Sequence, residues 1–149
     1  MRAAVTDSVH RLMSVVAVIA VCGMVVSSVS LQHHYAKSKT EYCDIGETFN
    51  CDIVNRSEYS KLLGVPVALI GMLGYAALAG LATISRERQA TPSLLFAGAA
   101  AGLAFALYLS YIEKYELGVW CILCLSSLGL ISISTVLGAA IWCKSRRES

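Results

Sequence analysis

Charged residues are scarce in this sequence. Asp, Glu, Lys and Arg make up 15% of its 149 residues, whereas hydrophobic residues make up 56%. A soluble domain of this size would have nearer a quarter of its residues charged, and the helices of a soluble bundle would each show a polar face. The composition therefore argues against a soluble protein. The chain also lacks internal repeats, low-complexity tracts and any nucleic-acid-binding signature.

Charge is absent altogether from four long stretches. Each holds at least 20 residues, the length that a helix needs to cross the hydrocarbon core of a bilayer. Helices also pair every backbone N–H and C=O within the segment, as the bilayer requires. The sequence therefore predicts an all-α membrane protein, a four-transmembrane-helix bundle that forms one domain over residues 1–149, with spans at about 12–31, 65–85, 93–112 and 117–143.

Residues 32–64 form the one long segment outside the spans. Asp52 to Leu63 reads as a short amphipathic helix, in which Asn55 and Glu58 have the spacing of an N-cap and its N3 partner. In the second span, small residues are expected to let neighbouring helices approach closely; they are Gly64, Gly71, Gly74 and Gly80.

The basic residues indicate an orientation. An even number of spans places both termini on one side of the membrane, and that side collects seven Lys and Arg residues against five on the other. Because basic residues concentrate in the cytoplasm, we expect cytoplasmic termini in a multi-pass protein of the cell's inner (plasma) membrane. The loop over residues 32–64 then faces outward. Cleavage of the first span as a signal peptide is an alternative, but its apolar run exceeds the usual signal core.

Four of the six cysteines lie at the predicted outer side. Cys121 and Cys124 form a C-x-x-C near the outer end of the last span, with both sulfurs on one helix face. Cys43 and Cys51 lie eight residues apart in the outer loop. Thiolates attack disulfides, and a C-x-x-C pair lowers the pKa of its exposed thiol. The two pairs therefore suggest a relay, from the loop pair to the membrane pair and on to a lipid-soluble acceptor.

Other interpretations of the cysteines remain open. His33 and His34 could complete a zinc site with Cys43 and Cys51, or both pairs could be structural disulfides. Cys22, in the first span, and Cys143, at the end of the last, are interpreted as small hydrophobic fillers.

These motifs together resemble the bacterial branch of the vitamin K epoxide reductase family (VKOR). The resemblance rests on Cys43-Asp44-Ile45-Gly46, Cys51, Ser57, Leu63-Gly64-Val65-Pro66 and the C-x-x-C at Cys121 and Cys124, and it extends from Tyr42 to about Gly138. It implies a four-helix bundle around a quinone, ubiquinone, menaquinone or similar. It also implies that Cys121 and Cys124 lie beside the quinone, that Cys43 and Cys51 are the shuttle pair, with Cys43 passing electrons inward, and that Ser57 lies near the active disulfide.

The sequence departs from the animal members of that family. Leu128 stands where they have a quinone-contacting Tyr, and Val67 where they have a substrate-binding Asn. Both differences argue against epoxide reduction and leave quinone reduction in place. The candidate quinone contacts are Cys124, Asn55, Tyr59, Val67 and Leu128.

The resemblance implies a thiol:quinone oxidoreductase that supports disulfide bond formation. Electrons would come from a separate thioredoxin-like, DsbA-like periplasmic protein, because no thioredoxin domain is fused to this chain. The alternatives are an animal-type quinone or vitamin K epoxide reductase, a protein of the DsbB type, whose C-x-x-C would be expected in the first outer loop, and a non-enzymatic scaffold with structural disulfides.

Overall fold

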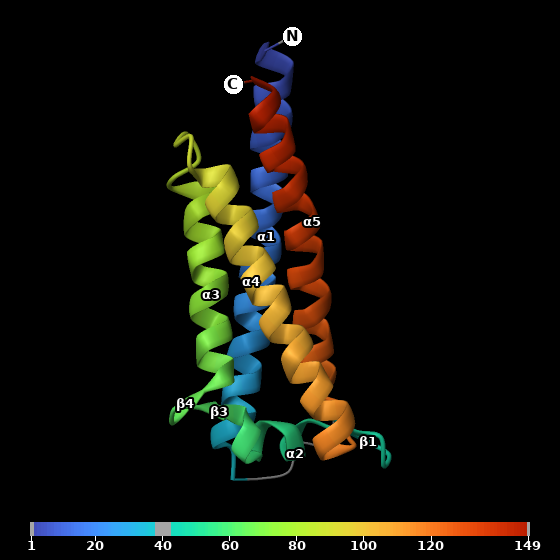
Figure 1. Cartoon of the computed structure of the whole chain (residues 1–149). Coiled ribbons are helices and arrows are strands. Elements are labelled where there is room, and N and C mark those ends of the chain that lie inside the picture. The colour runs from blue at the N-terminus through green and yellow to red at the C-terminus, as the bar shows by residue number, and fades with distance from the viewer. Residues whose placement is uncertain (1, 38–42, 149) are drawn as a thin grey trace.

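Four helices form an up-and-down bundle in this computed structural model, which describes residues 2–37 and 43–148. They are α1 (Arg2–Tyr35), α3 (Val67–Thr83), α4 (Thr91–Ile112) and α5 (Ile122–Glu148). Helix α1 packs against α3 and α5, and α4 packs against α5 and α3. The two ends of the chain lie at the same end of the bundle, as an even number of up-and-down helices requires (Figure 1).

The helix bounds differ from the predicted spans most in α1 and α5. Helix α1 continues through the polar residues on both sides of its apolar stretch. Helix α5 begins at Ile122, five residues later than the span predicted from residue 117. The chain leaves α4 through a single wide turn, η3 (Glu113–Leu117), and Gly118 then adopts the left-handed conformation with φ 64°. That conformation suits glycine and interrupts the helix, so Cys121 precedes α5 instead of lying inside it.

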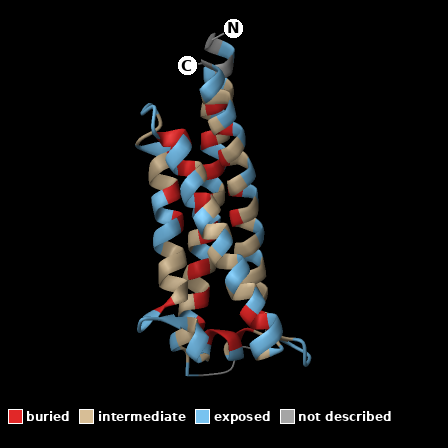
Figure 2. Cartoon of the chain, viewed as in Figure 1, coloured by how far each residue is buried: buried red, intermediate tan, exposed pale blue. Residues whose placement is uncertain are grey.

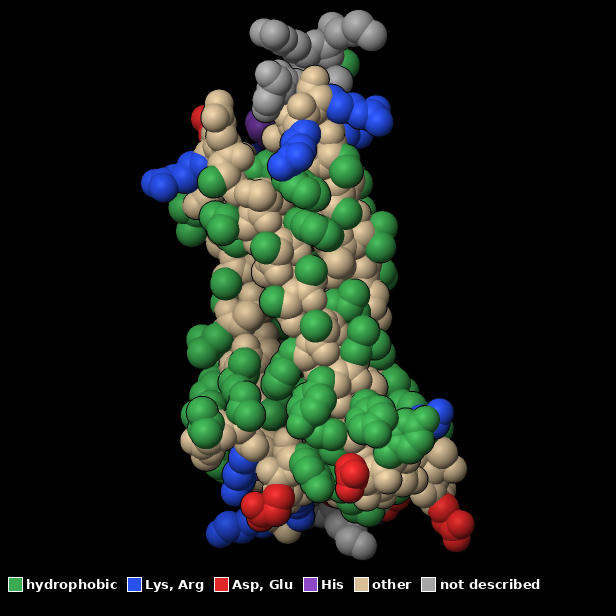
Figure 3. Space-filling model, viewed as in Figure 1, with side chains coloured by type: hydrophobic (Ala, Val, Ile, Leu, Met, Phe, Trp, Pro, Cys, Tyr) green, Lys and Arg blue, Asp and Glu red, His purple; other side chains and the backbone are tan. Residues whose placement is uncertain are grey.

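The outer surface of the bundle is apolar. In the space-filling view the charged side chains gather at the two ends, and the middle of this face carries none (Figure 3). By length and composition, the helical stretches Thr6–Tyr35, Thr91–Leu117 and Ile122–Arg147 can cross a membrane. Helix α3 is apolar and has 17 residues, which is at the short end of the range for a transmembrane helix. The chain therefore has the outer surface of a membrane protein.

Buried residues recur along the length of the bundle (Figure 2), and small residues set how closely its helices pack. One predicted close approach is present: a Cβ on Gly71 of α3 would lie 3.2 Å from the Ser27 Oγ of α1. Two others involve glycines that the prediction did not name. A Cβ on Gly23 of α1 would lie 2.4 Å from the ring of Tyr75, and one on Gly138 of α5 would lie 3.2 Å from the Phe96 Cα. By contrast, Gly74 and Gly80 of the second span have no such neighbour within 4 Å.

The segment between α1 and α3 closes one end of the bundle. Its elements are β1 (Asp44–Ile45), β2 (Phe49–Asn50), α2 (Cys51–Arg56), η2 (Glu58–Ser60), β3 (Lys61–Leu62) and β4 (Val65–Pro66). Strand β1 pairs antiparallel with β2, and β3 pairs antiparallel with β4.

Only the first half of the helix predicted over residues 52–63 is present. Helix α2 ends at Arg56, because Ser57 is extended and its hydroxyl donates to the Val54 carbonyl at 2.8 Å; such bonds compete with the helical pattern. The N-cap is Asn50, whose Oδ1 accepts from the Ile53 N–H at 3.0 Å. Asn55, the predicted cap, is instead buried inside α2.

We expect Gly23→Ala to destabilise the protein by about 1–3 kcal/mol, because the added methyl group would overlap the Tyr75 ring. The matched control is Gly80→Ala, where the methyl group meets nothing within 4 Å and helix propensity improves. Thermal unfolding in detergent measures both. Equal melting temperatures for the two variants would contradict the packing described here.

Candidate active site

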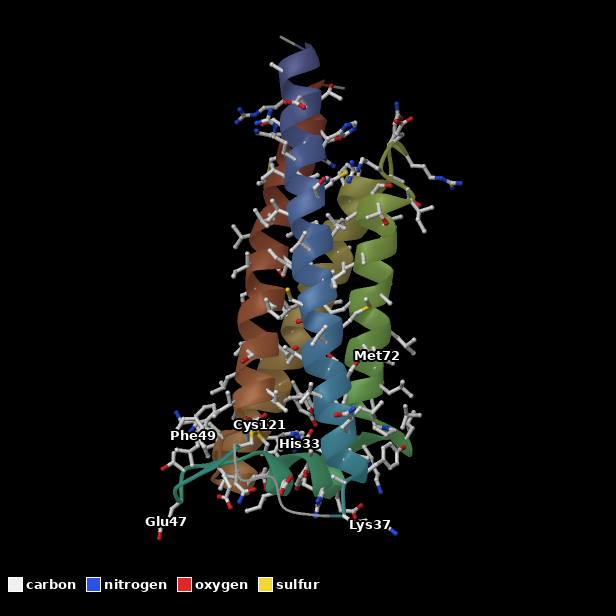
Figure 4. The ribbon with its side chains drawn as sticks, turned by 180° about the vertical axis from the view of Figure 1, so that it is seen from behind. His33, Lys37, Glu47, Phe49, Met72 and Cys121 are labelled. Carbon is white, nitrogen blue, oxygen red and sulfur yellow. A yellow bond between two sulfur atoms is a disulfide. The ribbon has the colours of Figure 1, made fainter. Side chains whose placement is uncertain are left out.

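Both cysteine pairs meet at the end of the bundle that the outer segment closes. Cys43 and Cys51 form a disulfide with a Cα–Cα distance of 5.6 Å, whereas Cys121 and Cys124 are free thiols. Cys43, Cys51 and Cys121 share one buried cluster with Val54, and Cys124 packs against it. Figure 4 shows Cys121, Phe49 and His33 at this same end of the bundle. The fold thus brings together cysteines that lie about 70 residues apart in the sequence.

Backbone hydrogen bonds hold the outer segment against the C-x-x-C. The Trp120 N–H donates to the Thr48 carbonyl at 2.9 Å, and the Asn50 N–H donates to the Trp120 carbonyl at 3.0 Å. Cys51 follows Asn50 and Cys121 follows Trp120. The pairing therefore places the start of α2 directly beside the C-x-x-C.

Asn55 joins three parts of the site. Its Oδ1 accepts from the Ser30 hydroxyl of α1 at 2.6 Å. Its amide nitrogen donates to the Cys51 carbonyl at 3.0 Å and lies 3.9 Å from the Cys121 sulfur. A buried amide with all of these partners fixes α2 relative to α1 and Cys121.

The surroundings of Cys121 favour its thiolate. Hydrogen bonding with the Cys124 side chain is the largest cause that lowers the pKa of Cys121, and backbone N–H groups lower it further. One of these is the Cys124 N–H, which lies 3.4 Å from the Cys121 sulfur in the first turn of α5. Burial and the nearby Glu113 oppose the shift. Because a thiolate is the attacking species in disulfide exchange, Cys121 suits that chemistry.

A cavity of about 370 Å³ opens between the helices next to this cluster. Its wall is mostly apolar, with a few polar groups, which is the usual make-up of a small-molecule site. Of the predicted quinone contacts, Asn55, Tyr59, Val67 and Cys124 line it. Ser57, which was predicted to lie near the active disulfide, lines it as well. On α5 the wall continues through Ser127 and Ile131, and Leu128 is not among the lining residues.

Tyr75 links two helices beside this cavity. Its hydroxyl donates to the Ser127 carbonyl at 2.8 Å and lies 3.0 Å from the Ser127 Oγ. Helices α3 and α5 are thereby joined by a polar contact inside an apolar bundle, and both residues face the cavity. The sequence did not predict a role for Tyr75, because a single Tyr within an apolar span forms no recognisable pattern.

The histidines of the alternative zinc site have other partners. His33 is buried, and its Nδ1 lies 3.3 Å from a carboxyl oxygen of Asp52. His34 makes a short hydrogen bond with the Asn55 carbonyl oxygen and lines the cavity. Since Cys43 and Cys51 are bonded to each other, the four residues do not act as a ligand set in this structure.

Sequence reasoning missed Glu113, which it treated as part of a tight loop between spans. Its side chain is 2% exposed, and its Oε2 accepts from the Cys121 N–H at 3.1 Å. It also lines the cavity. The available signal was the position of Glu113 directly after an uncharged stretch. The same position is equally typical of a solvent-exposed residue at the end of a helix.

Comparison with protein families agrees with this geometry. Residues 14–139 match the Vitamin K epoxide reductase family. The match covers more than four fifths of the chain and includes both cysteine pairs, all of α3 and α4 and most of α1 and α5. Members of this family are membrane oxidoreductases that act on thiols, disulfides and quinones. The paired cysteines, the apolar bundle and the matched sequence together identify this chain as a member of the vitamin K epoxide reductase family.

Proposed function

We propose that this protein is a four-span thiol:quinone oxidoreductase that oxidises a thioredoxin-like partner and passes the electrons to a membrane quinone. The observation that carries the proposal is the contact between the Cys43–Cys51 disulfide and Cys121 in one buried cluster, with Cys124 in the wall of an apolar cavity. Separated cysteine pairs would not support a relay.

The chemistry balances as three exchanges. A partner thiolate attacks the Cys43–Cys51 disulfide, and the partner's second thiol completes its own disulfide. The reduced loop pair then reduces a Cys121–Cys124 disulfide in the same way. Finally the Cys121–Cys124 dithiol gives two electrons and two protons to the quinone, which leaves as the quinol. The net reaction converts a partner dithiol and a quinone into a partner disulfide and a quinol.

The contacts around Cys121 bear on which loop cysteine attacks the Cys121–Cys124 disulfide. The family resemblance assigns this step to Cys43. The Asn55 amide, however, contacts both the Cys51 carbonyl and the Cys121 sulfur, and the pairing of Asn50 with Trp120 brings Cys51 next to Cys121. These contacts favour Cys51 for the exchange with Cys121.

The proposed orientation places the two cysteine pairs on the outer, periplasmic side of the membrane and both termini in the cytoplasm. The exposed Glu47 tests the outer segment, since Cys43 and Cys51 are themselves buried. We expect a membrane-impermeant thiol reagent to label Glu47→Cys in intact cells and to reach Cys143, the exposed cysteine near the other end, only after lysis. Mass spectrometry reads both sites. Labelling in the opposite order would overturn the orientation.

Quinone reduction with two different thiol donors distinguishes the roles of the two cysteine pairs. We expect Cys121→Ala and Cys124→Ala to abolish quinone reduction, followed by absorbance in detergent, with any thiol donor. Cys43→Ala should abolish it with a reduced thioredoxin-like protein but spare part of it with dithiothreitol, because a small thiol can reach the inner pair directly. Cys22→Ser and Cys143→Ser are matched controls outside the site. No quinone reduction by the wild type with either donor would rule out the proposed function.

Trapping tests the relay itself. Removal of a resolving cysteine leaves the preceding mixed disulfide intact. We therefore expect Cys124→Ala to accumulate a Cys51–Cys121 disulfide under oxidising conditions, detected by peptide mapping. A Cys43–Cys121 disulfide would reverse the order of the loop cysteines. Neither species, with wild-type activity intact, would make the loop disulfide structural.

A further inference from the structure

Glu113 is the one carboxyl residue among those that line the cavity in the described part of the chain. It lies at the end of α4, in the turn η3, and is 2% exposed. Glu116, three residues further in the same turn, is exposed to solvent. The two residues therefore have the same chemistry, a similar position in the chain and opposite environments.

The two oxygens of Glu113 have different surroundings. Oε2 accepts from the Cys121 N–H at 3.1 Å. Oε1 is buried and has no hydrogen-bond partner in the part of the chain that the structure describes. A buried polar atom without a partner costs free energy, and such atoms often mark a functional requirement. Support of the Cys121 backbone needs only one acceptor and leaves the second oxygen unexplained.

The Cys124 thiol lies within interaction range of the Glu113 carboxyl group, and both residues line the cavity. The carboxyl group thus binds the backbone of one active-site cysteine and shares the cavity wall with the other. No Lys or Arg forms an ion pair with it among residues 2–37 and 43–148. A carboxyl group in this position can exchange a proton with the sulfur that faces the cavity.

Quinone reduction requires such an exchange. The Cys124 thiol must lose its proton before its sulfur can react, and each quinone oxygen must gain one. The other polar groups of the wall are hydroxyls, an amide and an imidazole, and the remaining wall is apolar. Glutamate is a common general acid–base residue, and a group of that kind contributes typically 10²–10⁴-fold to a rate.

We propose that Glu113 is a catalytic proton carrier, which accepts the proton of the Cys124 thiol and delivers it to a quinone oxygen. The inference rests on the proposed function. In the net step, the S–H bonds of Cys121 and Cys124 are replaced by one S–S bond, and the electron pair released by this oxidation reduces the quinone. One proton travels from Cys124 through Glu113. The second comes from the Cys121 thiol or, where that thiol is already ionised, from water, and the product is the quinol.

Several other titratable groups lie around this site, and their protonation can also affect how the rate of quinone reduction depends on pH. Asp52 of α2 lies beside His33, and Arg56 of α2 is exposed and donates to the Ala36 carbonyl. Those that face Glu113 or the cavity are Cys121, Cys124, His34, Tyr59 and Tyr75.

The test is Glu113→Gln, with Glu116→Gln as the matched control. Glutamine keeps an acceptor for the Cys121 N–H but cannot carry a proton. With dithiothreitol as donor, we expect kcat for quinone reduction to fall about 100-fold at pH 7 in Glu113→Gln and to stay at the wild-type value in Glu116→Gln. The acidic limb of the wild-type pH profile, where the carboxylate becomes protonated, should disappear in Glu113→Gln.

A second readout separates proton transfer from structure. In a Cys124→Ala background, Glu113→Gln should still form the loop–Cys121 disulfide, because that exchange does not involve the quinone. If Glu113→Gln fails to fold, Glu113→Asp decides, since it retains a carboxyl group and should retain an acidic limb.

A wild-type rate and acidic limb in Glu113→Gln, or a folded Glu113→Asp without that limb, would overturn the inference. Either result would leave the proposed function intact as long as the wild type reduces quinone. If the wild type does not, the proposed function itself fails.

Discussion

The backbone pairing of Thr48 and Asn50 with Trp120 is the interaction on which the site depends. It joins a polar segment outside the bundle to the residue immediately before the C-x-x-C. These are the backbone hydrogen bonds that join the segment to the start of the C-x-x-C. With this pairing, the Cys43–Cys51 disulfide is buried against Cys121, and α2 forms part of the wall of the cavity. Two backbone hydrogen bonds therefore organise both the redox contact and the shape of the cavity.

The polar side chains of the site extend this arrangement. Asn55 connects Ser30 with Cys51 and Cys121, and Glu113 connects the end of α4 with the Cys121 backbone. Each polar group is buried among apolar neighbours, where a hydrogen bond contributes more than it does in water. The consequence is a rigid frame around Cys121, in which its own sulfur is the reactive element.

The sequence predicts the bundle and the cysteine pairs well, because apolar stretches and cysteine spacing are local signals. It fails where long-range contacts decide the structure. The end of α2 at Arg56 depends on the Ser57 hydroxyl, and the start of α5 depends on the left-handed Gly118. Asn55 and Glu113 look like ordinary helix and loop residues until the fold buries them. The close approach at Gly23 likewise depends on Tyr75, 52 residues away.

The length of α1 sets the height of the redox centre relative to a bilayer. A helix of 34 residues is about 51 Å long at 1.5 Å per residue, whereas the hydrocarbon core is about 30 Å thick. Helix α1 is therefore longer than the hydrocarbon core is thick. Ser30, His33 and His34 lie on its last turns and hold the residues around Cys121. In the orientation proposed above, this length places the cysteines near the headgroup level, which is within reach of both the proposed protein donor and the proposed quinone.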